Sequence, residues 1–115
     1  MRCHCGGGEG LVIGLVCLEM ERQDEKWGEQ NHPLIGGNDV DWWRDRQVAA
    51  FAGAESYWKR INDRRVEEDT MGWDSILLEE VYEALAATEP ADQVTELLQV
   101  AAVAIQAAKA IERAA

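Results

Sequence analysis

Apolar residues recur at intervals of three and four along most of the chain, which is the spacing of one face of an α-helix. This pattern predicts helices over residues 11–27, 40–68, 73–87 and 90–113. Gly53 leaves room for a break in the second segment, so four or five helices are expected. No segment alternates apolar and polar residues as a half-buried strand does, and the chain is therefore predicted to be an all-α helical bundle.

Glycine and proline indicate where the helices should end. Gly28 directly follows the first predicted helix, a position where glycine commonly terminates helices. The polar stretch around Pro33 predicts an irregular loop before the second helix. Residues 1–10 are rich in glycine and are expected to form a flexible tail, whereas residues 11–115 are expected to form a single all-α domain.

Charge and composition exclude several classes of protein. The 115 residues include 22 acidic and 11 basic side chains, a net charge of −11, which argues against a nucleic-acid partner. The longest apolar run, residues 11–18, is too short to span a bilayer and lacks the features of a signal peptide. Three cysteines are too few for a disulfide framework and fit a reducing compartment, so no membrane and a cytoplasmic location are expected.

The tail contains Cys3, His4 and Cys5, which are residue types that bind zinc. Adjacent ligands without a second pair at the usual spacing are a weak signal, and Cys17 is too far along the chain to complete a site by spacing. We expect these three residues to be ordinary exposed side chains.

The joint between the last two predicted helices is so short that it forces an antiparallel C-terminal helical hairpin. With the turn centred between residues 89 and 90, residues whose numbers sum to 179 should lie opposite one another. Glu83 then faces Glu96, and Glu80 faces Gln99. Within each helix the two residues are three apart and share one face. The hairpin should therefore bring three carboxylates and one carboxamide together.

Such a group of side chains suits a hard divalent cation. Carboxylates at close range repel one another, and one takes up a proton unless a cation lies between them. Oxygen ligands are those preferred by Mg²⁺, and Mn²⁺ is a possible substitute. The alternative is that these glutamates are solvated like most acidic residues on helix surfaces.

The arrangement Glu80-Val-Tyr-Glu83, twelve intervening residues and Glu96-Leu-Leu-Gln99 resembles the ExxE…ExxD signature of the MazG-like nucleoside triphosphate pyrophosphohydrolases. Glu79 completes the doubled glutamate that often opens this signature. Residues 21–33, 73–80 and 96–103 are also similar to blocks of a MazG-like group found in bacteria and their phages.

This resemblance implies an all-α enzyme that hydrolyses the bond between the α and β phosphates of a nucleoside triphosphate. It implies that Glu80, Glu83 and Glu96 hold Mg²⁺, and that Glu79 orients water or supports the metal ligands. Gln99 stands where the wider family has aspartate, so the site loses one negative charge. An amide oxygen still coordinates a hard cation, but more weakly, which leaves the number of metal ions and the capacity for hydrolysis open.

The amino-terminal block contains residues suited to the rest of a nucleotide. The basic side chains can meet phosphates, Trp27 can stack on a base, and the polar loop can read a base edge or a sugar. Alternatively Trp27 is a core anchor and the loop caps a helix, and the four remaining tryptophans are expected to serve packing. The candidate substrate-binding residues are Arg22, Lys26, Trp27, Gln30, Asn31 and His32.

The leading hypothesis from the sequence is a Mg²⁺-dependent nucleotide pyrophosphohydrolase that works as a homodimer or homotetramer, as MazG-like proteins usually do. The competing hypothesis is a non-catalytic helical module that binds nucleotide or a partner protein through the same groove. A structural or regulatory phage protein would need no metal. The sequence leaves base and sugar preference open, alarmone nucleotides included.

Overall fold

The structure, a computed structural model, describes residues 10–37 and 41–115. These residues form four helices, and no strand occurs within the described ranges, so the prediction of an all-α fold is confirmed. The helices agree with the predicted segments to within one residue at every end. They are α1 (Gly10–Trp27), α2 (Asp41–Glu68), α3 (Trp73–Ala86) and α4 (Pro90–Ala114).

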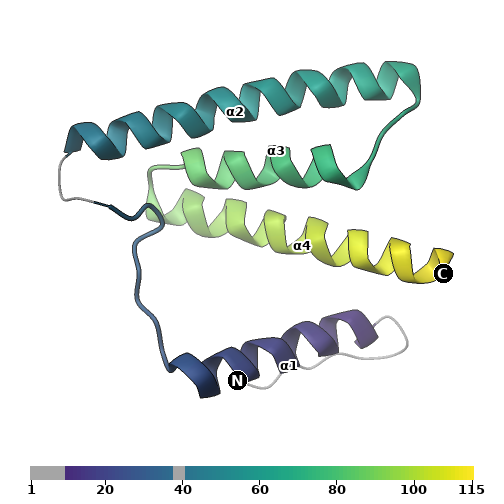
Figure 1. Ribbon diagram of the computed structural model, residues 1–115, viewed down its shortest axis with the longest axis horizontal. Coiled ribbons are helices and arrows are strands. Elements are labelled where there is room, and N and C mark those ends of the chain that lie inside the picture. Colours follow the sequence, from purple (N-terminus) through teal and green to yellow (C-terminus); the bar gives the residue numbers. More distant parts are fainter. Residues whose placement is uncertain (1–9, 38–40) are drawn as a thin grey trace. The chain divides into compact units, whose positions relative to one another are not determined.

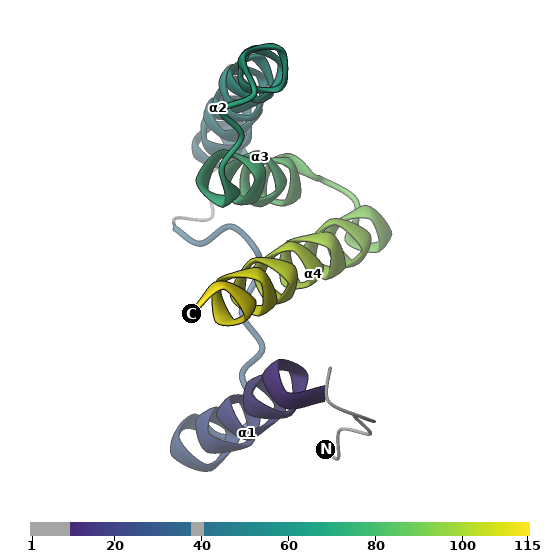
Figure 2. The same cartoon turned by 90° about the vertical axis from the view of Figure 1, so that its right-hand side faces the viewer.

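The chain divides into two compact units. One comprises Met1–His32, described from residue 10 onward, together with Ala108–Ala115, and its main element is α1. The other comprises Pro33–Ala107 and contains α2, α3 and most of α4. Within this second unit successive helices run in opposite directions, and α3 lies between α2 and α4 (Figures 1 and 2).

The second helix is continuous over 28 residues, so the possible break at Gly53 does not occur. It ends at Glu68, and the next residue, Asp69, has a positive φ of 54°. The backbone N–H of Thr70 donates to the carbonyl of Arg65 at 2.9 Å, and that of Asp69 to the carbonyl of Val66 at 3.4 Å. This is the Schellman pattern, which satisfies the last carbonyls of a helix, here with aspartate instead of glycine in the left-handed position.

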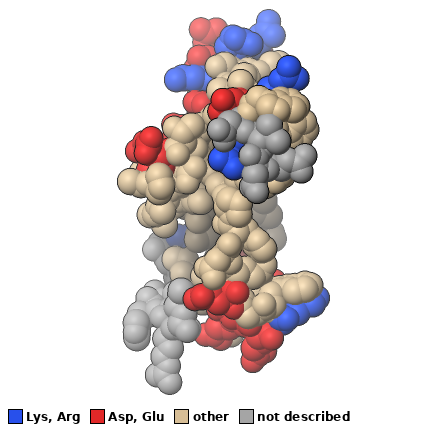
Figure 3. All heavy atoms as spheres, turned by 90° about the vertical axis from the view of Figure 1, so that its left-hand side faces the viewer, with Lys and Arg blue, Asp and Glu red and all other residues tan. Residues whose placement is uncertain are grey.

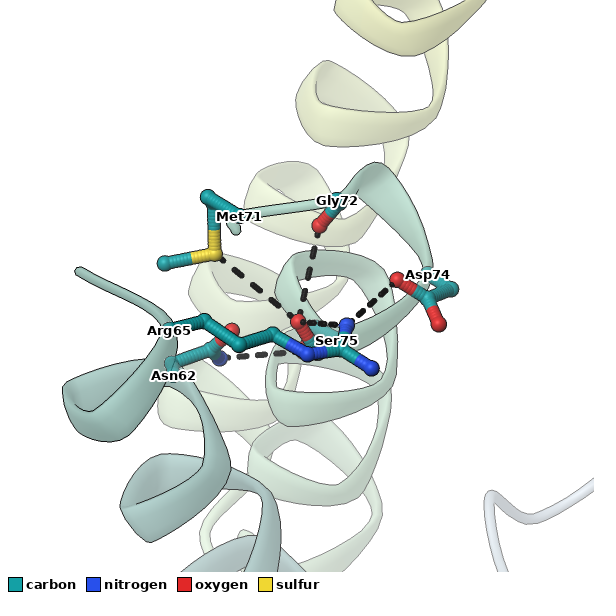
Figure 4. A network of polar contacts seen from close by, with 6 residues as sticks. All are labelled: Asn62, Arg65, Met71, Gly72, Asp74 and Ser75. Atoms are coloured by element: carbon teal, nitrogen blue, oxygen red, sulfur yellow. Dashed lines mark hydrogen bonds and ion pairs between the residues drawn. The ribbon is translucent and has the colours of Figure 1, made fainter. Parts of the chain in front are cut away.

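A polar network holds the turn between α2 and α3 (Figure 4). Ser75, at the start of α3, is fully buried, and its hydroxyl accepts a hydrogen bond from Arg65 Nη1 at 3.0 Å. Asn62 Nδ2 donates to the Ser75 carbonyl at 3.0 Å, and Arg65 Nη1 also pairs with Asp74 at 2.8 Å. Because these partners lie on both helices, they fix which residues of α2 lie opposite which residues of α3.

The turn between α3 and α4 is as short as the sequence predicts. Pro90 is the first residue of α4, where a missing N–H costs nothing. Gln93 stabilises the turn with two hydrogen bonds. Its backbone N–H donates to the Glu89 carbonyl at 2.9 Å, and its side-chain Nε2 donates to the Ala87 carbonyl at 3.0 Å. The predicted antiparallel C-terminal hairpin is therefore present (Figure 1).

The loop before α2 packs against the start of that helix. Gly37 has φ 116°, and a Cβ atom at this position would come within 2.7 Å of Trp43 Nε1. Glycine is therefore required here both for its backbone conformation and for the close approach of the indole ring.

Few of the described residues are completely buried. Among the described residues, only Ser75 and Ala84 fall in the buried class. The expectation that the tryptophans serve packing holds best for Trp58, which is half-buried. It is wrong for Trp42, which is 57% exposed, and the core alternative for Trp27 does not fit a side chain that is 62% exposed.

The last helix differs from expectation in its hydropathy. By length and composition alone α4 could cross a bilayer, with a mean hydropathy of 1.4 over its most apolar 18-residue window. Core helices of helical bundles meet the same criterion. Apolar side chains of this helix are largely uncovered, since Val94 is 59% and Leu98 66% exposed.

Candidate metal centre

The C-terminal hairpin brings the predicted acidic residues together. Glu80 and Glu83 of α3 and Glu96 of α4 each place one carboxylate oxygen so that all three atoms lie within 4.8 Å of one another. Ligand oxygens around a six-coordinate cation with bonds of about 2.1 Å lie about 3 to 4 Å apart, so a small inward movement would suit such an ion. The register inferred from the short turn therefore agrees with the structure.

Gln99 lies beside the same carboxylates. With its amide nitrogen turned toward them, Nε2 donates to Glu80 Oε2 at 3.1 Å and to Glu96 Oε2 at 3.3 Å. The opposite orientation of the amide directs Oε1 at these two oxygens, which is favourable only when a cation lies between them. The side chain can therefore either bridge two carboxylates as a donor or join them as a fourth oxygen ligand.

The carboxylates disfavour their own ionisation. Partial burial raises the pKa of Glu80, and the charge of Glu96 raises it further. Partial burial likewise raises the pKa of Glu83, with Glu96 and then Glu80 as the nearest negative charges. No basic side chain is among the causes of either shift. A cation is therefore the kind of ligand that would remove the repulsion within this cluster.

Glu55, on α2, is a member of this acidic region that the sequence analysis missed. Its charge contributes to the raised pKa of both Glu80 and Glu83, and it is half-buried. The signal was present in the spacing: Glu55 is four residues after Phe51 and three before Trp58, so it interrupts the apolar face of α2. Phe51 stacks on Tyr82 of α3, which shows that this face of α2 packs on α3.

Glu79, predicted to orient water or support the ligands, is half-buried and next to Glu80 in α3. Its charge also raises the pKa of Glu80 and, more weakly, that of Glu83. It does not belong to the group whose oxygens lie within 4.8 Å of one another. Its position is consistent with a supporting role and not with a direct ligand in this arrangement.

The candidate substrate-binding residues all lie in the other unit, on α1 and the loop that follows. Arg22 Nε donates to Glu19 Oε2 at 2.8 Å, and this pairing, followed by a hydrogen bond from Gln23, lowers the pKa of Glu19 to about 2. Lys26 Nζ lies 4.9 Å from the centre of the Trp27 ring. The two basic side chains are thus engaged locally, although both remain exposed to solvent.

The polar loop is held by contacts between its own side chains. His32 Nε2 lies 3.0 Å from Gln30 Oε1, and Asn31 Nδ2 donates to Glu29 at 3.3 Å. All of these side chains are exposed. The helix before them ends at Gly28 with φ 69°, and the Gly28 N–H donates to the Asp24 carbonyl at 2.8 Å, as the sequence predicts for this position.

The structure describes only one of the three cysteines, and its bonding does not support the expected reducing compartment. Cys3, His4 and Cys5 lie outside the described residues. Cys17, on α1, is disulfide-bonded. The argument from the cysteine count to a reducing compartment therefore has no support from this residue.

Comparison with known proteins adds no family assignment. No family model, no curated protein and no solved structure matches this chain.

Proposed function

We propose that this protein is a Mg²⁺-dependent nucleotide pyrophosphohydrolase, which converts a nucleoside or deoxynucleoside triphosphate to the monophosphate and pyrophosphate. The observation that carries the proposal is the convergence of Glu80, Glu83 and Glu96 from two helices, with Gln99 in contact. Glu80, Glu83 and Glu96 match the MazG-like signature, and Gln99 occupies the position of its aspartate.

In this proposal Glu80, Glu83, Glu96 and Gln99 hold the cation, and Mn²⁺ can replace Mg²⁺. A cation bound there would neutralise phosphate charge and help to activate the attacking water. Glu79 and Glu55 supply further negative charge beside these ligands, which would strengthen the attraction of a cation, and Glu79 would also orient water. On α1 and its loop, Arg22, Lys26, Trp27, Gln30, Asn31 and His32 remain candidates for contacts with the substrate.

The experiment is a panel of nucleoside and deoxynucleoside triphosphates, incubated with protein and Mg²⁺ and assayed for pyrophosphate together with the monophosphate. Glu83→Gln should abolish turnover, whereas Glu67→Gln, which removes an exposed glutamate on α2, should not. Release of orthophosphate in place of pyrophosphate would refute the proposed reaction. Equal activity of both variants would refute the assignment of the site.

A second candidate function is a non-catalytic module that binds nucleotide through the same helices. Gln99 favours it, because this neutral side chain can donate to two carboxylates and so stabilise the cluster without a cation. Calorimetry separates the candidates: binding of a triphosphate with no product across the whole panel would favour the module.

We also propose that the protein acts as a homodimer or homotetramer. The exposed apolar side chains of α4, such as Val94 and Leu98, fit a helix that a second copy covers. Light scattering at several protein concentrations tests this directly, and a monomer throughout would refute it.

A further inference from the structure

A cavity of about 620 Å³ opens within the Pro33–Ala107 unit. Its walls come from the loop before α2, the first half of α2 and the turn between α3 and α4. Figure 3 faces the end where these segments meet, and residues other than Lys, Arg, Asp and Glu make up most of the surface that is coloured there. The volume lies within the range of about 300 to 1,000 Å³ that is typical of small-molecule sites.

The cavity lies close to the acidic region along α2 and α4, and it reaches the turn that follows α3. On α2 and on α4, one residue that lines the cavity is three positions from a glutamate of the acidic region, and so shares a face of the helix with it. One turn of helix is about 5.4 Å long, so the cavity begins one turn away from the carboxylates. The pairs are Ala52 with Glu55 and Gln93 with Glu96, and Ala87, directly after α3, is four positions from Glu83.

The walls suit a flat, uncharged ring. Leu34, Ile35 and Val48 provide aliphatic surface, and alanines on α2 and in the α3–α4 turn leave room in the cavity. Gln93 is held in place because its Nε2 donates to the Ala87 carbonyl at 3.0 Å, so its Oε1 is the atom left to accept a hydrogen bond. Thr88 adds a hydroxyl that can donate or accept.

We propose that this cavity holds the nucleoside of a nucleotide whose phosphates lie at the carboxylate cluster, with Gln93 accepting a hydrogen bond from an N–H group of the base. The inference rests on the proposed function, since it needs phosphates at the cluster. Arg44 and Asp45 also line the cavity, and their opposite charges offset each other. The cavity therefore has no excess of positive charge that would favour a phosphate group over the nucleoside.

The test compares a nucleoside triphosphate with inorganic tripolyphosphate, each titrated calorimetrically into the full-length protein with Mg²⁺. Ala52→Leu fills the cavity, and Ala50→Leu is the matched control, because both alanines are exposed on α2 and only Ala52 lines the cavity. Circular dichroism verifies that both variants keep the helical content of the wild type.

We expect Ala52→Leu to weaken binding of the nucleoside triphosphate at least tenfold and to change the affinity for tripolyphosphate less than twofold. Ala50→Leu should change neither. If the wild type binds both ligands but Ala52→Leu behaves as Ala50→Leu does, this inference is wrong while the proposed function stands. If the wild type binds neither ligand, the proposed function fails and this inference fails with it.

Discussion

Replacing Glu83 with glutamine should stabilise the protein when no divalent cation is present. One oxygen of Glu83 lies within 4.8 Å of an oxygen on each of Glu80 and Glu96. Two unit charges at this distance repel by about 0.9 kcal/mol at the dielectric constant of water and by about 3.5 kcal/mol at an effective value of 20. Glutamine keeps the shape of the side chain and removes both repulsions that involve residue 83.

All three glutamates are partly exposed, so solvent screening keeps the effect near the lower of these limits. We expect the free energy of unfolding to rise by about 1 to 2 kcal/mol at pH 7.5 in the presence of a chelator. The assay is urea denaturation followed by circular dichroism. Glu67→Gln removes an exposed glutamate from α2 and should change the same quantity by less than about 0.5 kcal/mol.

Adding Mg²⁺ should reverse the order of stability. A ligand at a hundred times its dissociation constant stabilises the folded state by about 2.7 kcal/mol, and only a protein that binds the ion gains this. The wild type should then exceed Glu83→Gln, which lacks one charged ligand. The reasoning would be refuted if Glu83→Gln were no more stable than Glu67→Gln under chelation, or if Mg²⁺ stabilised both variants equally.

Three further predictions follow from the same geometry and from the turns. Gln99→Asp adds a carboxylate to the cluster, so calorimetry should show tighter Mg²⁺ binding, and unchanged binding would mean that residue 99 points elsewhere. Because the pKa values of Glu80 and Glu83 are raised, the folded state binds more protons than the unfolded state above pH 4.5. The melting temperature of the metal-free protein should therefore fall as the pH rises from 4.5 through the raised pKa values. In Glu83→Gln the melting temperature should fall less. Ser75→Ala removes the buried hydrogen-bond acceptor for Arg65 and should lower the free energy of unfolding by about 1 to 2 kcal/mol. A substitution of the exposed Asp74 should lower it less. Equal losses in a denaturation assay would contradict this account of the turn.

Local chemistry made most of the secondary structure predictable. Helical spacing of apolar residues located all four helices, Gly28 located the end of α1, and Pro90 located the start of α4. The C-terminal hairpin was equally predictable, because so short a joint requires the two helices to be antiparallel and fixes which residues lie opposite one another. Glu80, Glu83, Glu96 and Gln99 could therefore be grouped from their numbers alone, although their function remains a proposal.

Features that depend on how a helix is rotated against a distant segment were not predictable in this way. Glu55 joins the acidic region only because the face of α2 that carries Phe51 packs on α3, and the sequence does not state which face that is. The continuity of α2 through Gly53 was also undecided, since packing can outweigh the helix-weakening effect of one glycine.

What the sequence by itself determined is the all-α class, the helix ends and the pairing across one tight turn, because each depends on interactions between residues close together in the chain. Only the tertiary structure decided the exposure of Trp42 and the cavity between the residue 33–35 loop, α2 and the α3–α4 turn. These depend on contacts between segments far apart in the sequence, and the free energy of such contacts comes from shape and burial that no local pattern encodes.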